Sequence, residues 1–374
     1  MLSQLGPVAY NDERKWGKKV DVGLIGLPRS GKTTIFNLLT GQQVEVNQFG
    51  GGKVESRRGL AAVPDQRLDR LAEMYHPRKV TPAQVTVVDV PGLSHSETGG
   101  PNRFLHDVRL VDALVHVVRG FASDLGDAPH PLDDLQDMEL ELGLSDLDLL
   151  EKRRQRIGAG KKVTREQQDE LNLVTRLIDA LENGDRLDRV DLTPEESSFL
   201  RNYQFLTLKP MVWVINVDDA AFQERDFMGK DEIMALAESK GIPVVLMAGV
   251  LEQEIQALED ADREVFMADL GLTQSGLARV AHATYASLGL ISFLTAGEDE
   301  VRAWAIAQNT TAKAAAGRIH SDIERGFIRA EVVAFEDLMR AQSMSKARDQ
   351  GLVRLEGKDY VMKDGDIVNF RFNV

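Results

Sequence analysis

Eight residues near the N-terminus have the types and the spacing of a phosphate-binding loop. Residues 26–33 read G-L-P-R-S-G-K-T. Gly26 and Gly31 would let backbone N–H groups converge on phosphate oxygens, and the ammonium group of Lys32 adds a mobile positive charge. The hydroxyl of Thr33 can ligate Mg2+. A glycine-containing turn can match this pattern by chance, so the flanking segments decide whether it indicates a nucleotide site.

The segments on both sides have the character that such a site needs. Residues 20–25 form an apolar run that predicts a buried strand, and residues 34–40 repeat apolar side chains at helical spacing. The N-terminus of that helix would direct its positive dipole end at the phosphates. We therefore predict that the chain binds a nucleoside triphosphate. The residues expected to hold it here are Gly26, Arg29, Ser30, Gly31, Lys32, Thr33 and Thr34.

A second motif supports the first. Residues 85–93 read V-T-V-V-D-V-P-G-L, an apolar strand that ends in D-x-x-G, about sixty residues after the loop. In P-loop NTPases an acidic residue at the tip of the neighbouring strand holds the Mg2+ shell, and the following glycine donates its N–H to the γ-phosphate. We expect Asp89 to be a metal ligand together with Thr33. Gly92 and Lys32 are the corresponding catalytic candidates.

Three further apolar runs, 113–118, 210–215 and 243–247, predict strands that alternate with helices. Strands and helices alternating after a phosphate loop predict an α/β fold, with a parallel sheet and helices on both faces. The second run is followed by N-V-D-D, where a GTPase places its base-reading N-K-x-D, and the third by the place of a second base-contacting loop. The residues expected to meet the base are Asn216, Val217, Asp219, Ala248 and Gly249.

The chain resembles the YchF subfamily of Obg-related GTPases, the Obg-like ATPases, as a divergent member. The most specific match is the C-terminal stretch, which reads F-L-T-A-G-E-D-E-V-R-A-W from Phe293, then A-A-G-R-I-H-S-D-I-E-R-G-F-I-R-A-E-V, then L-E-G-K-D-Y-V-M-K-D-G-D-I-V-N-F-R-F-N-V to Val374. The resemblance implies a P-loop domain, a helical insertion and a C-terminal TGS domain of ubiquitin-like β-grasp fold. It also implies hydrolysis of ATP or GTP, Mg2+ as cofactor, and association with ribosomes or their factors in translation.

The insertion is also visible in the residues themselves. Residues 135–157 and 165–183 each repeat leucines at helical spacing, which predicts an antiparallel hairpin of coiled-coil type. Thr193 and Glu196 have the spacing of a capping box, so a short helix is expected to start there. The expected organisation is a flexible tail at 1–19, a P-loop domain at 20–131 and 209–288, the insertion at 132–208, and the TGS domain at 289–374.

Composition sets the class of protein and narrows the partners. The chain has 374 residues, no cysteine and a net charge of −14, and no apolar run reaches membrane-spanning length. We expect a cytoplasmic protein with no membrane or DNA partner. The negative charge argues against a surface that wraps nucleic acid as a whole, but a local basic face can still contact rRNA.

Two places offer such a basic face, and each has a plainer interpretation as solvated charge. The tip of the hairpin carries Lys152, Arg153, Arg154, Arg156, Lys161, Lys162 and Arg165. The C-terminal domain carries Arg302, Trp304, Arg318, His320, Arg325 and Arg329. In the second group, Trp304 is equally well interpreted as part of the core of a small β-grasp domain.

Departures from the family pattern bear on hydrolysis. Leu93 stands where many GTPases place the Gln that orients the attacking water, so turnover should be slow. His95, Glu97 and His130 are weak candidates for that role, and a surface side chain without a task is the better account of each. Arg29 replaces the family's Asn, and we hypothesise that it supplies positive charge near the β–γ bridging oxygen. The alternative is an exposed side chain that points to solvent.

Other departures bear on base choice and on sensing. Asp219 stands where the family has Glu, which accompanies its preference for ATP, so ATP is favoured while GTP stays open. The loop 42–59 lacks the expected Thr and contains three consecutive glycines at 50–52, so ordering it costs more entropy. The leading hypothesis is a slow NTPase switch on ribosomes. The rival is a nucleotide-gated ribosome-binding module with little hydrolysis, and a metabolic kinase is disfavoured.

Overall fold

The computed structural model describes residues 20–43, 56–90, 103–123, 126–160, 164–187, 190–200 and 203–373. Within these ranges the chain divides into two compact units. The first is formed by Asp21–Gly59 and Val87–Leu277, the second by Leu60–Thr86 and Ala278–Val374. The expected tail at 1–19 lies outside the described residues. None of the described helices is long and apolar enough to cross a membrane.

A six-stranded sheet with the order β2-β4-β1-β5-β6-β7 positions the candidate site. Its strands are β1 (Asp21–Ile25), β2 (Arg57–Val63), β4 (Ala83–Asp89), β5 (Ala113–Arg119), β6 (Met211–Asn216) and β7 (Val244–Met247). Strands β1, β5, β6 and β7 pair in parallel. Nearly every residue of β5 and β6 is buried, because helices cover both faces of the sheet. The predicted α/β fold is confirmed.

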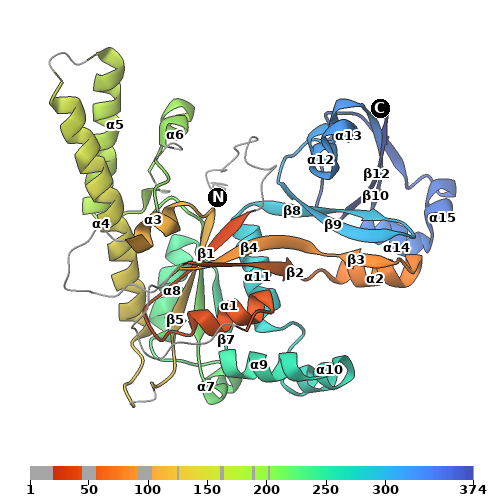
Figure 1. The fold of residues 1–374 in the computed structure, drawn as a ribbon, viewed down its shortest axis with the longest axis horizontal. Helices are drawn as coiled ribbons and strands as arrows, with labels where there is room; N and C mark the ends of the chain where they lie inside the picture. Colours follow the sequence, from red (N-terminus) through yellow and green to blue (C-terminus); the bar gives the residue numbers. More distant parts are fainter. Residues whose placement is uncertain are drawn as a thin grey trace. The chain divides into compact units, whose positions relative to one another are not determined.

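Some helices of the first unit lie against this sheet, and others, among them α5 and α6, extend away from it (Figure 1). They are α1 (Lys32–Thr40), α3 (Arg103–Arg109), α4 (Pro131–Gly158), α5 (Arg165–Glu182), α6 (Pro194–Leu200), α7 (Asp219–Glu224), α8 (Lys230–Lys240), α9 (Gly249–Ala257) and α10 (Asp260–Asp269). On one face, Leu135 of α4 and Ile233 of α8 share a core with Trp213 of β6. Elsewhere α1 lies next to α9, where Gln256 donates to the carbonyl of Leu38.

Helices α4 and α5 form the predicted hairpin. Leu150 and Val174 meet in its core, and Arg153 pairs with Glu170 across the two helices, with 2.8 Å between Nη2 and Oε2. The expected capping box before α6 is present as well. The Thr193 amide donates to Glu196 Oε2 at 2.9 Å, and the Glu196 amide donates to Thr193 Oγ1 at 3.2 Å.

A buried charge network fixes the base of the hairpin. Asp146 of α4 is fully buried and accepts hydrogen bonds from Nη1 of Arg109 (2.8 Å) and from the amides of Leu206 (3.1 Å) and Thr207 (2.8 Å). Its Oδ2 also accepts from the Thr207 hydroxyl at 2.9 Å. A buried carboxylate is costly unless it is paired and fully hydrogen-bonded, and these donors meet that need. The network ties the end of α3 to α4.

The second unit is built on a mixed sheet with the order β11-β10-β12-β8-β9-β3. Its strands are β3 (Lys79–Thr81), β8 (Leu290–Ala296), β9 (Glu300–Ala307), β10 (Phe327–Ala334), β11 (Arg354–Glu356) and β12 (Asp366–Phe372). Its helices are α2 (Gln66–Tyr75), α12 (Ala312–Ile319), α13 (Ser321–Arg325), α14 (Phe335–Ala341) and α15 (Met344–Asp349), and α11 (Gly276–Ser287) leads into it. The central strands β8 and β12 run parallel and α12 packs on the sheet, which fits a β-grasp fold.

The division of the chain differs from the expected domain bounds. Residues 60–86 group with the C-terminal residues, because β3 pairs in parallel with β9 and Arg67 binds Asp364 with 2.8 Å between Nη1 and Oδ2. The C-terminal unit accordingly begins at Ala278 instead of 289. These pairings join segments more than two hundred residues apart, so no local pattern announces them.

Residues 359–363, before the turn at Asp364 and Gly365, are not a strand of the sheet, whereas β12 begins directly after that turn at Asp366. Val361 instead forms an isolated bridge with Thr311, and the amide of Met362 donates to the carbonyl of Thr310. The alternating side chains before the turn therefore pair with the segment that precedes α12.

Candidate functional site

The phosphate-binding loop connects β1 to α1 and needs glycine at both ends. Gly26 has φ +148°, and a Cβ there would lie 2.2 Å from the carbonyl oxygen of Val117. Gly31 has φ +94°, and a Cβ there would lie 2.3 Å from Nδ2 of Asn216. Both positions combine positive φ with the close approach of a neighbour, so a larger residue would distort the loop. The two glycines that the pattern singled out are thus required by the geometry.

Lys32 is curled back onto this loop. Its Nζ donates to the carbonyls of Gly26 (2.9 Å) and Leu27 (2.7 Å), and the residue is 7% exposed. Burial lowers the pKa of Lys32 to about 8, while Asp89 opposes the shift by attraction. The ammonium group is therefore held at the loop by two neutral acceptors. Anionic phosphate oxygens are stronger acceptors than carbonyls, so a polyphosphate would compete for it well.

Thr33 and Asp89 meet although 56 positions separate them. Oγ1 of Thr33 lies 3.3 Å from Oδ2 of Asp89, at the carboxyl end of β4. Burial raises the pKa of Asp89, and Lys32, the Thr33 hydrogen bond and Arg57 act to lower it. The sequence prediction that these two residues converge agrees with the geometry.

The same pair fits a magnesium ion. A hydroxyl and one carboxylate are hard oxygen ligands, and Mg2+ in nucleotide sites is commonly held by one or two such groups plus phosphates and waters. The described residues contain no group of three His, Asp or Glu side chains that could hold a metal alone.

Asn216 connects the phosphate loop to the loop after β7. Its Nδ2 donates to the carbonyl of Ser30 at 3.0 Å, and its Oδ1 accepts from the amide of Gly249 at 2.9 Å. A Cβ built on Gly249 would lie 3.6 Å from Cγ2 of Thr34, so the start of α9 lies against the start of α1. Both ends of the Asn216 amide are thus used within the protein. Asn216 therefore joins the two loops. Its contact with the base stays a separate prediction.

The other expected base-contacting residues divide by exposure. Val217 is 3% exposed and belongs to the core, and Ala248 is 1% exposed. The Val217 side chain packs next to Gly120, where an added Cβ would lie 2.8 Å from Val217 Cγ1, and a contact of residue 217 with the base stays a prediction. Asp219, in the first turn of α7, is exposed, and its side chain makes no hydrogen bond or ion pair with the described residues. It stays available to a ligand.

Arg29 has a left-handed backbone, with φ +63°, and an exposed side chain. Within the described ranges its guanidinium makes no hydrogen bond or ion pair, so it is free to contact a ligand at the loop. Ser30 is 1% exposed, and its hydroxyl has no partner among the described residues. These two residues complete the set expected in the loop.

Several expected residues lie outside the described residues. They are Gly92, Leu93, His95, Glu97 and the glycines at 50–52. Of the candidates for positioning water, only His130 is described: it precedes α4, is exposed, and its Nδ1 lies 3.9 Å from Asp133. Ser56, at the end of the loop that lacks the expected Thr, donates its hydroxyl to Asp107.

His116 was missed as a feature of the site. It lies on β5 beside Ile25, the residue before the phosphate loop, and is 0% exposed. Neither ring nitrogen has a hydrogen-bond partner in the described part of the chain. Burial lowers the pKa of His116 to about 3, with Lys32 contributing by repulsion. The only signal in the sequence is a histidine inside an apolar strand, which by itself indicates no function.

The two basic faces considered for RNA are largely satisfied internally. At the hairpin, Lys152 pairs with Asp148 (2.6 Å) and Arg154 with Glu151 (2.9 Å), besides the Arg153 pair. In the C-terminal unit, the guanidinium of Arg302 lies 3.9 Å from the ring centroid of Trp304, and Phe293 stacks on the same ring. The geometry favours the plainer interpretation for Trp304.

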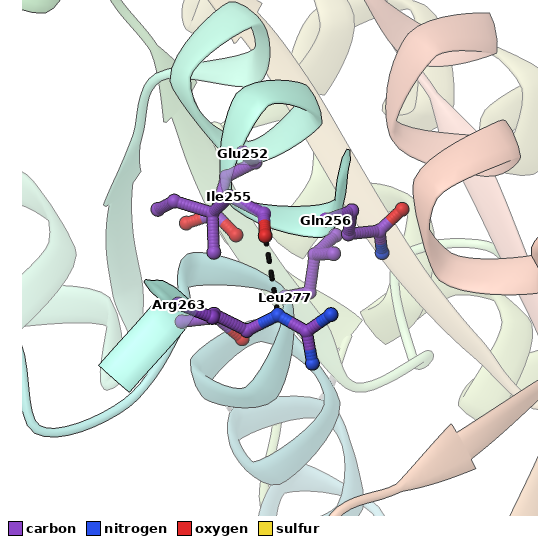
Figure 2. A pocket seen from close by; sticks show the side chains of 6 residues that line it. Glu252, Ile255, Gln256, Arg263 and Leu277 are labelled. Carbon is purple, nitrogen blue, oxygen red and sulfur yellow. Dashed lines mark hydrogen bonds between the residues drawn. The ribbon is translucent and has the colours of Figure 1, made fainter. Parts of the chain in front are cut away.

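A cavity of about 400 Å3 lies beside α9, away from these residues (Figure 2). It is lined by Glu252, Ile255, Gln256, Arg263, Ser275 and Leu277. Arg263 donates from Nε to the carbonyl of Ile255 at 3.1 Å, and Glu252 accepts from the amide of Gly276. These bonds hold α9 against its neighbours, and none of the residues expected to bind nucleotide lines the cavity.

Comparison with known proteins assigns the family. Residues 21–146 match a model described as a 50S ribosome-binding GTPase, and residues 290–373 match the C-terminal model of the YchF GTPases, described as a protein of unknown function. The Ribosome-binding ATPase YchF of Haemophilus influenzae is 40% identical over 362 residues, covering 94% of this chain and 99% of the relative. The chain belongs to the YchF family. The Bacillus subtilis YchF is 37% identical over 363 residues, with the same coverage.

A solved YchF structure has the same fold. The YchF GTPase of Schizosaccharomyces pombe superposes with a TM-score of 0.82 at 28% sequence identity, covering 96% of this chain and all of that one. The family and fold expected from the sequence are therefore confirmed. The name TGS for the C-terminal domain stays a prediction.

Proposed function

We propose that this YchF protein binds a magnesium–nucleoside triphosphate at residues 26–34, hydrolyses it slowly, and uses the bound state to govern its association with ribosomes. One observation carries the proposal: Lys32 lies beside the Thr33–Asp89 pair at the end of the parallel strands β1 and β4. The bacterial relatives named above are ribosome-binding ATPases. A protein that acts on ribosomes is expected in the cytoplasm.

Binding follows from the charges of the loop. The amides between Gly26 and Thr33 and the N-terminus of α1 present positive dipoles to phosphate oxygens. Lys32 would exchange its two carbonyl acceptors for phosphate oxygens, and Thr33 and Asp89 would hold Mg2+. The metal supplies neutralisation of the charge that develops on the phosphates. Gly92 is expected to add an amide at the γ-phosphate.

Arg29 is proposed as a further source of positive charge in hydrolysis. The left-handed backbone costs an ordinary side chain about 1–2 kcal/mol, so the loop holds this residue in an unfavourable conformation. Its guanidinium is free of protein partners among the described residues. A free guanidinium at the phosphates can stabilise charge at the β–γ bridging oxygen as the bond breaks.

ATP is the proposed substrate, with GTP as the alternative. Asp219 is the exposed acceptor expected beside the base. The lysine of the GTPase motif is missing, because position 217 is a valine, and this valine is buried in the core. Competition binding of labelled ATP and GTP tests this assignment. The expected result is tighter binding of ATP, and a clear excess affinity for GTP would reverse it. Asp219→Ala should change the ratio of the two affinities while leaving phosphate binding intact.

The experiment that tests the proposal as a whole is single-turnover hydrolysis with and without purified ribosomes. We expect slow cleavage by the chain alone, and none by Asp89→Ala or Lys32→Ala. Nucleotide binding without any cleavage in either condition would favour the rival function, a nucleotide-gated ribosome-binding module. A direct contact between the hairpin tip and rRNA has less support, since Lys152, Arg153 and Arg154 are already paired.

A further inference from the structure

Two leucines on α4 face solvent side by side. Leu140 is 61% exposed and Leu144 is 49% exposed, while Leu135 and Leu142 of the same helix are buried. Residues four apart lie next to each other on a helix, so Leu140 and Leu144 form one apolar patch, named here the leucine pair. Single exposed leucines are common, but adjacent ones on a regular helix leave apolar surface that a partner could cover.

The neighbouring row of α4 is acidic and lacks counter-ions. Asp133, Asp137 and Glu141 follow one another at intervals of four, which places them in one row beside the leucine pair. Carboxylates four apart on a helix repel each other. No Lys or Arg of the described residues pairs with any of these three, and residues 131–151 contain no Lys or Arg at all. This row is named here the acidic row.

Four of the five remaining acids of this segment show the contrast, and the fifth, Asp134, has only a Coulombic attraction to Arg119 and to His130. Glu139 is paired with Lys240, Asp146 with Arg109, Asp148 with Lys152 and Glu151 with Arg154. Each of these four has a cation within the protein, so their charges are accounted for by the fold. The three members of the acidic row are different, because none of them forms an ion pair with a Lys or Arg of the described chain, and only the exposed ring of His130 lies near Asp133.

The two rows together select one class of occupant. A phosphate backbone would be repelled by the acidic row, so RNA does not fit. A second copy of this chain, with net charge −14, would place the same acidic row against itself in a symmetric dimer. A helix with apolar residues on one side and Lys or Arg along the border would bury the leucine pair and neutralise the row.

We propose that this face of α4 docks a basic amphipathic segment of a protein partner. We take that partner to be a ribosomal protein, an assignment that rests on the association with ribosomes in the proposed function. The docking chemistry itself does not depend on ribosomes, so the two can be tested apart.

The first test uses the full chain and two labelled helical peptides of 18 residues, one of Leu and Lys, the other of the same pattern with Glu for Lys. Fluorescence anisotropy at low salt should show binding of the Leu–Lys peptide only. Leu140→Ser with Leu144→Ser should weaken it by about tenfold or more, since two apolar contacts are lost. Asp137→Asn with Glu141→Gln should weaken it at low salt, and the difference should vanish at high salt.

Met234→Ser with Val265→Ser is the matched control, because both residues belong to the same unit and are exposed to 46% and 63%. This control variant should bind the Leu–Lys peptide as tightly as the parent chain does. The control variant and the two test variants should all keep the melting temperature of the parent chain. Equal binding of the Leu–Glu peptide, or insensitivity of the Leu–Lys peptide to the leucine substitutions, would overturn the docking proposal.

The second test asks which molecule occupies the face on ribosomes. A benzophenone amino acid replaces Leu144 in the full chain, and the complex with purified ribosomes is irradiated. A cross-linked band that is unchanged by ribonuclease and in which mass spectrometry finds peptides of this chain and of a ribosomal protein supports the proposal. Cross-links to rRNA or to a second copy, or none although the chain co-sediments, contradict it. If the chain fails to co-sediment, the ribosomal assignment falls, and the peptide test alone decides the chemistry of the face.

Discussion

Arg29 is the single residue whose charge we propose to promote hydrolysis of the bound nucleotide. Its guanidinium is exposed, has no partner among the described residues, and lies in the phosphate loop at a position where the resemblance to the family leads us to expect Asn. We expect Arg29→Asn to lower the single-turnover rate by about tenfold to a thousandfold without potassium, because an arginine at the phosphates contributes on that order or more. Potassium should restore part of the rate in the variant and leave the parent protein unchanged.

The same assay of Arg29→Asn can also contradict the proposed role of this residue. An Arg29→Asn protein with an unaltered rate and an unaltered response to potassium would show that the guanidinium only faces solvent. Nucleotide affinity, measured in parallel, separates a loss of binding from a loss of catalysis.

His116 predicts a pH dependence of stability. Its native pKa of about 3 lies below the ordinary value of 6.5, so between these values the unfolded chain binds the extra proton. The contribution of His116 to the free energy of unfolding is therefore fully present above pH 6.5 and is lost as the pH falls towards 3. The loss approaches about 1.4 kcal/mol per pH unit, or about 2 kcal/mol between pH 7 and pH 5.

Urea denaturation of the parent chain and of His116→Phe across this range measures the effect. The difference in unfolding free energy between the two should change with pH in that direction. His130→Asn, at an exposed histidine, should show no such change. Parallel pH profiles for the parent and His116→Phe would contradict the assignment.

At the scale of the helix, Asp146 holds the hairpin to α3. Removing one partner of a buried charged pair typically costs about 3–5 kcal/mol, because the other is left unpaired. We expect Asp146→Ala to lose stability of that order, since Arg109 and the amides of Leu206 and Thr207 lose their acceptor. Chemical denaturation monitored by circular dichroism gives the number.

Asp148→Ala is the control on the same helix. Its ion pair with Lys152 is exposed on both sides, at 62% and 64%, and pairs of that kind contribute about 0–1 kcal/mol. Equal effects of the two substitutions would mean that the Asp146 network does not anchor the hairpin.

Elements whose local pattern is decisive were predictable. Strands β5 and β6 have apolar runs that only burial explains, and α4, α5 and the capping box before α6 follow from spacing along the chain. The edge strand β3 and the bridge at Val361 were not, because each depends on a partner far away in sequence. Local propensity carries no information about such a partner.

The site shows the same limit. The approach of Thr33 to Asp89 could be predicted, because the carboxyl ends of adjacent parallel strands meet at one edge of the sheet. The part played by Asn216 could not, since its two partners are backbone atoms of separate loops. The burial of Val217 could not be predicted either, because its position in the motif says nothing about its exposure.

For the whole molecule, the prediction concerns coupling between nucleotide and partner. If the bound nucleotide governs association, co-sedimentation with ribosomes should differ between saturating non-hydrolysable ATP analogue and saturating ADP. Asp89→Asn should remove the difference, because the residue that would hold Mg2+ at the γ-phosphate is neutralised. Equal sedimentation of the parent chain in both states would leave the protein a binder without a switch.

The clamp made by Asn216 has a consequence for anyone who wishes to re-engineer base selectivity. A substitution of Asn216 would loosen the phosphate-binding loop together with the loop after β7, because both loops form a hydrogen bond with its carboxamide. The side chain of Asp219 has no partner among the described residues. A substitution at this position could therefore create a preference for a modified nucleotide without disturbing the phosphate-binding loop. A chemical-genetic allele of this protein should therefore start from position 219.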